Sequence, residues 1–76
     1  MKEILHAIIS NLVDDKENIE IKEINNEKST IFEVKVSGKD MGKVIGRQGR
    51  VAQSIRTVMK AVAGREQKKI TIEFIG

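Results

Sequence analysis

Apolar residues near the start of the chain recur every three or four positions, which is helical spacing and predicts an amphipathic helix from Lys2 to Val13. A second stripe of this kind predicts a helix that runs from Arg50 to about Ala63, with Gly64 as its C-cap. Each helix has one apolar side that must be covered by another element. The two stripes consist of Ile4, Leu5, Ile8, Ile9, Leu12 and Val13, and of Val51, Ala52, Ile55, Val58, Met59 and Val62.

Three shorter stretches alternate apolar with polar residues, the pattern of a strand with one buried face. They run from about Asn18 to Ile24, from Thr30 to Ser37, and from Ile70 to Phe74. The polar residues 25–29 are typical of a turn, so the first two strands should form an antiparallel hairpin. A helical crossover separates the second strand from the third, which favours a parallel pair.

A short helix from Met41 to Ile45, with Asp40 as its N-cap, completes the pattern. The predicted order is α-β-β-α-α-β, without internal repeats, low-complexity tracts or linkers. This order indicates an α+β fold in which three helices cover one face of a three-stranded mixed sheet.

A chain of 76 residues fits one small domain, here residues 1–76. It has no cysteine, and its single histidine, His6, cannot form a metal site alone, so we expect neither metal nor cofactor. No apolar run approaches the roughly 20 residues of a membrane span, and the first residues lack the features of a signal peptide. We therefore expect a cytoplasmic protein that does not enter a membrane.

The net charge of +3 is unevenly distributed. Residues 1–38 carry five Lys/Arg and eight Asp/Glu, whereas residues 39–69 carry nine Lys/Arg and two Asp/Glu. Basic residues often do no more than solvate a helix face. Here they cluster in the region that also holds most of the glycines, which favours a surface that binds a polyanion.

Two glycines three positions apart, Gly46 and Gly49, separate the short predicted helix from the long one. Glycine permits positive φ and the close approach of another chain. The backbone N–H groups at the start of the second helix would face solvent, with the positive end of the helix dipole behind them. Such a helix start suits a phosphate group, and Arg47 and Arg50 add charge there. Taken alone, a turn of this kind is more often only a turn.

Other phosphate-binding and catalytic motifs do not fit the sequence. No Gly-Lys-Ser/Thr of a Walker loop is present, and Gly42, Gly46 and Gly49 lack the spacing of a dinucleotide fingerprint. No carboxylate pair, Cys/His set or nucleophile with a nearby base stands out. We expect a protein that is not an enzyme and has no small-molecule substrate.

The element order, with a Gly-x-x-Gly turn between the last two helices, resembles the KH domain in its type II arrangement. The segment from Val44 to Val51 fits the family's pattern of an aliphatic residue, Ile, Gly, two variable residues, Gly and a following aliphatic residue. With its Met-Lys-Glu-Ile start and the later segment from Ile55 to Val58, the whole chain is similar to the KhpA family of small bacterial single-KH proteins.

The resemblance implies binding of single-stranded RNA, with about four nucleotides in a narrow groove. It places the turn against the sugar-phosphate backbone, the short helix along one wall, and the start of the long helix within reach of a phosphate or a base edge. Val44, Ile45 and Val51 can alternatively face the core, and we expect at least one of them to do so. The implied site residues are Gly42, Lys43, Val44, Ile45, Gly46, Arg47, Gln48, Gly49, Arg50, Gln53 and Ser54.

The residue types also indicate how such binding would work. The chain has no Trp or Tyr, and its two aromatic residues, Phe32 and Phe74, occupy strand positions that predict burial in the core. Without exposed aromatic rings for stacking, affinity would rest on phosphate contacts and aliphatic packing. We therefore expect weak binding of low specificity.

Two alternatives remain open from the sequence. The helices Met41–Ile45 and Arg50–Ala63 could form a helix-turn-helix that binds duplex DNA, although the first helix is short. The chain could also be a protein-interaction module that forms a homodimer. The resemblance implies a heterodimer with a second KH-containing RNA-binding protein, which is compatible with RNA binding and with an RNA-chaperone or post-transcriptional role.

Overall fold

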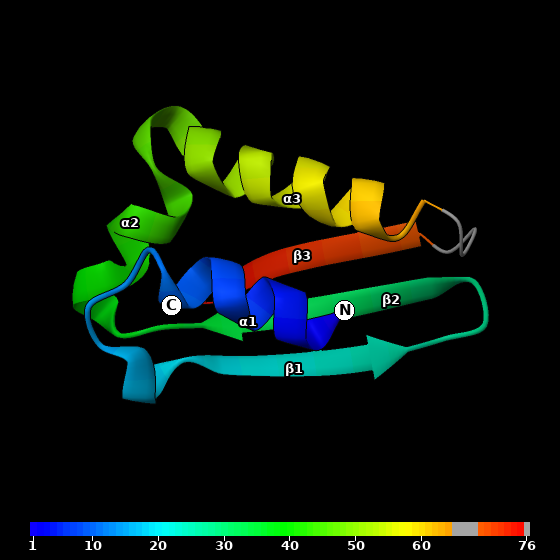
Figure 1. Ribbon diagram of the computed structural model, residues 1–76, viewed down its shortest axis with the longest axis horizontal. Coiled ribbons are helices and arrows are strands. Elements are labelled where there is room, and N and C mark those ends of the chain that lie inside the picture. Colours follow the sequence, from blue (N-terminus) through cyan, green and yellow to red (C-terminus); the bar gives the residue numbers. More distant parts are fainter. Residues whose placement is uncertain (65–68, 76) are drawn as a thin grey trace.

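The three strands form one mixed sheet with β2 in the middle (Figure 1). The computed structural model describes residues 1–64 and 69–75. Strand β1 (Glu20–Asn25) pairs antiparallel with β2 (Ser29–Lys35), and β3 (Lys69–Ile75) pairs parallel with β2. The predicted hairpin and the predicted parallel pair are both confirmed.

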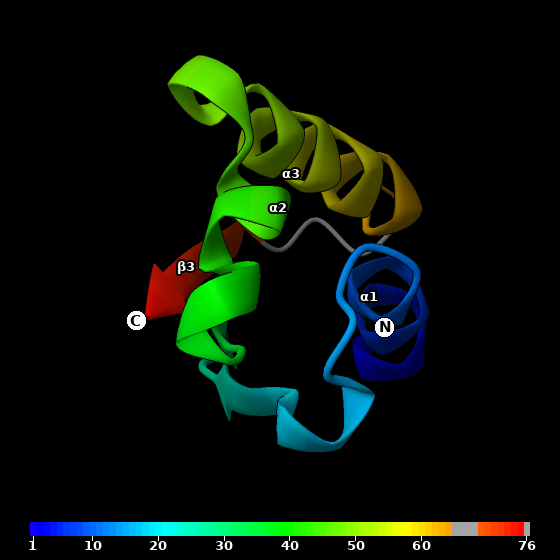
Figure 2. The same cartoon turned by 90° about the vertical axis from the view of Figure 1, so that its left-hand side faces the viewer.

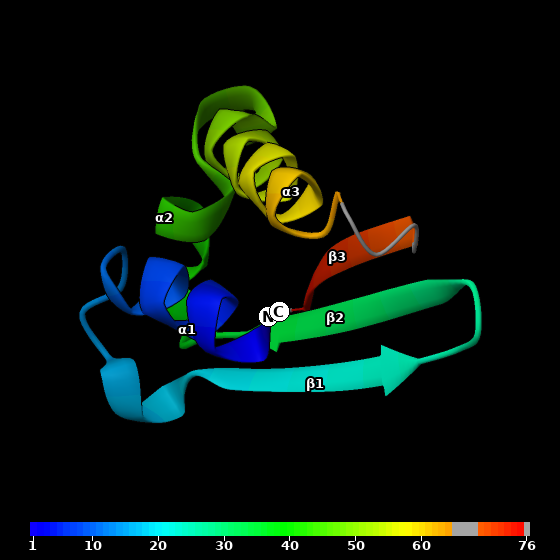
Figure 3. The ribbon, with the colours of Figure 1, turned by 45° about the vertical axis from the view of Figure 1, so that its right-hand side comes forward.

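Three helices lie on one side of this sheet, as Figure 3 shows. They are α1 (Lys2–Ser10), α2 (Met41–Ile45) and α3 (Arg50–Val62). The connections in the described residues contain three short 3₁₀ turns: η1 (Lys16–Asn18), η2 (Gly38–Asp40) and η3 (Arg47–Gly49). The expected α-β-β-α-α-β order and the α+β fold are confirmed, and α2 has its predicted bounds.

The core lies between the helices and the inner face of the sheet. Phe32 and Val34 of β2 are fully buried there, because they belong to the central strand and face the helices. The outer face carries charged residues that face one another across the strands, such as Lys22 opposite Glu33 and Glu20 opposite Lys35. The buried core residues are Leu5, Ile9, Val13, Ile21, Phe32, Val34, Val36, Val44, Ile55, Met59, Ala63, Ile70 and Ile72.

Helix α1 ends at Ser10, three residues before the predicted end at Val13. The Ser10 hydroxyl and the Asn11 side-chain amide both donate to the carbonyl of Ala7, at 3.1 and 2.9 Å. Such side-chain bonds compete with the backbone ladder and favour a helix end. Val13 is nevertheless buried, since the turn after the helix directs it into the core.

Several other boundaries and one aromatic residue also differ from prediction. The first strand starts at Glu20 rather than Asn18, and the second ends at Lys35 rather than Ser37. Ala63 rather than Gly64 is the C-cap of α3. Phe74 is only partly buried, because β3 lies at the edge of the sheet.

Candidate nucleic-acid interface

The glycine turn between α2 and α3 has an unusual backbone. Gly46 and Gly49 have φ of 76° and 75°, and Gln48 between them has φ of 57°. Left-handed φ costs a residue with a side chain about 1–2 kcal/mol, so the chain keeps Gln48 in an unfavourable conformation. Figure 2 shows that this turn extends beyond the bodies of α2 and α3. Strained backbone of this kind clusters at functional sites.

The two glycines serve different purposes. A Cβ atom on Gly46 would lie 2.9 Å from the backbone nitrogen of Val51, so Gly46 is required for the chain's own packing. A Cβ on Gly49 would meet nothing within 4 Å. Of the two, only Gly49 leaves open space for the approach of another molecule. The sequence had predicted close approach at both.

The polar residues of the predicted site are exposed around this turn. Arg47, Gln48 and Arg50 are exposed at the tip and at the first residue of α3. Gln53 and Ser54 follow on α3 and line a shallow hollow together with Arg50. The Ser54 hydroxyl donates to the carbonyl of Arg50, so its proton is already engaged within the helix.

The apolar residues of the predicted site divide between core and surface. Val44 is fully buried in the core, whereas Ile45 and Val51 are partly buried and pack against it. The expectation that at least one of the three faces the core is confirmed. Gly42 lies on the exposed side of α2 with open space around it.

Lys43 is held by two carboxylates. Its ammonium group bonds to Asp14 and lies 3.4 Å from Asp40. These contacts, led by the hydrogen bond to Asp14, raise the pKa of Lys43 above its ordinary value. Its charge is therefore already compensated within the protein.

Asp40 has a role that the sequence did not reveal. It precedes α2, as predicted, but its side chain does not cap that helix. The fully buried carboxylate instead accepts the backbone N–H groups of Asp15 and Asp14, at 3.0 and 3.3 Å. The bond from Asp15 and the others together lower the pKa of Asp40. Asp40 thus ties the connection after α1 to the start of α2, and no local pattern predicts such a contact.

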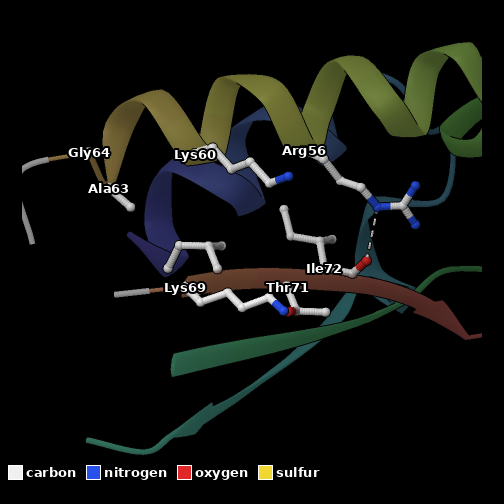
Figure 4. A pocket seen from close by; sticks show the side chains of 8 residues that line it. Arg56, Lys60, Ala63, Gly64, Lys69, Thr71 and Ile72 are labelled. Carbon is white, nitrogen blue, oxygen red and sulfur yellow. Dashed lines mark hydrogen bonds between the residues drawn. The ribbon is translucent and has the colours of Figure 1, made fainter. Parts of the chain in front are cut away.

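A hollow between α3 and β3, with a volume of about 540 Å³, was also missed (Figure 4). On one wall, the Nε of Arg56 donates to the carbonyl of Ile72 at 3.2 Å, and its guanidinium lies 5.6 Å from the centre of the Phe74 ring. Arg56 and Lys60, four residues apart, lie on the same side of α3. The four-residue spacing of Arg56 and Lys60 could have indicated from the sequence that two cations share one side of this helix.

The described part of the chain was compared with the requirements of a metal site and of a membrane-spanning helix, and meets neither. Residues 1–64 and 69–75 hold no group of three metal-ligating side chains. Within the same ranges, no helix has the length and apolar character needed to cross a bilayer.

Comparison with known proteins identifies the family. Residues 2–74 match the family described as "KhpA/KhpB, KH domain". A protein of Clostridium perfringens named "RNA-binding protein KhpA" is 52% identical over 99% of this chain and 100% of its own length. Proteins of the same name from Caldanaerobacter subterraneus and Borreliella burgdorferi are 48% and 40% identical, over 99% and 96% of this chain and 100% and 89% of theirs. No solved structure matches the chain. The chain belongs to the KhpA/KhpB family of KH-domain proteins.

Proposed function

We propose that this protein binds single-stranded RNA at the Gly46–Gly49 turn. The observation that carries the proposal is the combination of left-handed backbone, open space at Gly49 and an exposed Arg47 in the turn that precedes α3. The names of the relatives support the choice of RNA over the duplex DNA of a helix-turn-helix protein.

In this proposal a phosphate group approaches the turn from the open side of Gly49. The N–H of Arg50, the first residue of α3, already bonds to the carbonyl of Arg47. The phosphate would therefore meet the N–H groups that follow in the first turn of α3, where the helix dipole places positive charge. Arg47 and Arg50 supply exposed positive charges beside this position. Gly42 and Ile45 form the adjoining wall, with Gln53 and Ser54 further along α3.

Binding should be weak and of low specificity. Of the two aromatic residues, Phe32 is fully buried, and Phe74 is partly buried with the guanidinium of Arg56 over one face of its ring, so little aromatic surface is available for stacking. Phosphate contacts then dominate affinity and carry no base information. A general RNA-chaperone or post-transcriptional role in the cytoplasm, carried out by one non-enzymatic domain, fits such a site.

Pairing with another protein is a second candidate function, compatible with the first. Val58 and Val62 on α3 are 47% and 41% exposed, and Ile4 on α1, which contacts α3, is 44% exposed. Exposed apolar residues on two adjoining helices favour an interface. We propose a second KH-containing protein, or a second copy of this chain, as the partner. Sedimentation of the pure protein separates a homodimer from a monomer.

The test of the RNA proposal is a competition between a single-stranded RNA octamer and duplex DNA of equal charge. The protein should prefer the RNA. Because three or four phosphates are neutralised, log K should fall against log salt with a slope of roughly −2 to −3. Preference for the duplex, or a slope near zero, contradicts the proposal.

A further inference from the structure

Lys43 differs from the other cations around the glycine turn, because its ammonium group lies against two carboxylates. It bonds to Asp14 and lies 3.4 Å from Asp40. Arg47 and Arg50, by contrast, are exposed and form no ion pair with residues 1–64 or 69–75. Two carboxylates and one ammonium give the Asp14–Lys43–Asp40 cluster a net charge of −1 at neutral pH. The surface beside the turn is therefore not uniformly positive.

The two carboxylates of this cluster have different surroundings. Asp40 is fully buried and accepts the backbone N–H groups of Asp14 and Asp15, so it keeps hydrogen-bond partners even when Lys43 moves away. The side chain of Asp14 is 76% exposed, and Lys43 lies against it. The fold thus uses the backbone N–H of Asp14, while the carboxylate of Asp14 contacts Lys43.

The cluster lies close to the glycine turn. Lys43 precedes Gly46 by three residues, which is about 4.5 Å along the axis of α2. This separation is shorter than the Debye length of about 8 Å at physiological salt. Figure 1 shows the loop between α1 and η1, which carries Asp14, running beside α2. Because lysine has a flexible four-carbon stem, its ammonium group can turn either to Asp14 or to a phosphate at the turn.

A phosphate at the turn and the carboxylate of Asp14 would compete for the same ammonium group. The side chains of Lys43 and Asp14 are both exposed, at 45% and 76%, and an ion pair between exposed groups is weak. Binding of RNA through Lys43 would nevertheless break this contact. It would also leave the carboxylate of Asp14 facing the phosphate as a like charge. Both effects lower the affinity that Lys43 can contribute.

We infer that Asp14 attenuates RNA binding: its carboxylate holds Lys43 away from the RNA and thereby limits the affinity of the glycine turn for a phosphate. This inference rests on the proposed function. It adds to that function an intramolecular contact that competes with the ligand. Asp14 does not touch the RNA in this arrangement and acts through Lys43.

The experiment titrates a single-stranded RNA octamer with the wild type, Asp14→Asn, Lys43→Gln and the double variant. Asparagine at position 14 keeps the size of the side chain and the backbone N–H that bonds to Asp40, so folding should be retained, and circular dichroism verifies it. Glu17→Gln is the control of equal charge change, because Glu17 is exposed on η1 and forms no ion pair with Lys43. The NMR signal of the Lys43 ammonium group reports its contact with RNA.

Asp14→Asn should bind the octamer about threefold more tightly than the wild type, a gain of the size expected for one exposed ion pair. Its slope of log K against log salt should be more negative by about 0.7, the value for one further phosphate on a single strand. The ammonium signal of Lys43 should shift with RNA in this variant and stay nearly unchanged in the wild type. In the Lys43→Gln background the gain should be lost, and Glu17→Gln should bind like the wild type.

Three results would overturn the inference. The first is an Asp14→Asn variant that binds no more tightly than the wild type. The others are an equal gain in the Lys43→Gln background and an equal gain in Glu17→Gln, because general repulsion by acidic residues would then account for the effect. If neither the wild type nor Asp14→Asn binds the octamer, the proposed function fails and the inference fails with it. Wild-type binding that Asp14→Asn leaves unchanged overturns the inference alone.

Discussion

The carboxylate of Asp40 accepts a hydrogen bond from the backbone N–H of Asp15, 25 positions earlier in the chain, at a distance of 3.0 Å. The same carboxylate accepts the N–H of Asp14 and lies 3.4 Å from the ammonium of Lys43. These contacts fix the loop after α1 against the start of α2. Since the glycine turn follows α2 directly, its position depends on the buried carboxylate at the start of that helix.

Replacing Asp40 with Asn should lower stability at neutral pH and flatten its acid dependence. The pKa of Asp40 is lowered on folding from an ordinary value of 3.8. Its contribution is therefore complete above about pH 4 and is lost as pH falls through the lower, folded-state pKa. Urea denaturation from pH 2.5 to 7 measures this loss. Glu27→Gln, in the exposed hairpin, is the control and should keep the wild-type profile; a D40N profile as steep as that of the wild type would count against this role.

The two glycines of the turn should respond differently to alanine. Gly46→Ala should cost about 2–5 kcal/mol, because positive φ and crowding against Val51 add together. Gly49→Ala should cost only about 1–2 kcal/mol for its φ, since the space around it is open. RNA affinity of the folded Gly49 variant should nevertheless fall. Urea denaturation followed by RNA titration separates the two effects, and equal stability losses would contradict the distinction.

Lys43 should contribute less to RNA binding than Arg47. Its charge is compensated by Asp14 and Asp40, whereas Arg47 is exposed at the tip of the turn. Arg47→Gln should make the salt slope less negative by about 0.7, the value for one phosphate on a single strand, and Lys43→Gln should leave it nearly unchanged. Titrations at four salt concentrations decide this. Equal changes in slope would show that RNA displaces Lys43 from its carboxylates.

Arg56→Lys should destabilise the fold by about 1–2 kcal/mol, although the substitution keeps a positive charge at this position. Lysine has no guanidinium, so it cannot donate a hydrogen bond from Nε to Ile72 and at the same time place the rest of a planar cation over Phe74. Arg50→Lys, at the exposed start of the same helix, is the matched control and should change stability by less than about 0.5 kcal/mol. A double-mutant cycle with Phe74→Leu isolates the contact with the ring. A coupling energy of zero would mean that the ring contact contributes nothing.

Local periodicity was sufficient to predict most of the fold. The bounds of α2 and the parallel pairing of β2 with β3 follow from short-range spacing and from the crossover between them. The early end of α1 was missed because Ser10 and Asn11 bond back to Ala7, which depends on side-chain geometry rather than on the apolar stripe.

The site was only partly predictable for a related reason. Residues at the tip of the turn are adjacent in sequence, so the exposure of Arg47 and Gln48 could be predicted. The bond between Asp40 and Asp15, and the position of Lys69 across the hollow from Lys60, arise only when distant segments meet. The different roles of Gly46 and Gly49 likewise require the position of Val51.

The most direct test of RNA binding at the glycine turn is titration of a fluorescent single-stranded RNA with the double variant Arg47→Asp, Gln48→Asp. Both side chains are exposed, so folding should survive, and circular dichroism verifies it. A control with the same charge change, Lys22→Glu, Lys35→Gln, alters the outer face of the sheet instead. We predict that the turn variant loses binding while the control retains it. Unchanged binding by the folded turn variant would contradict this account and place the RNA site elsewhere.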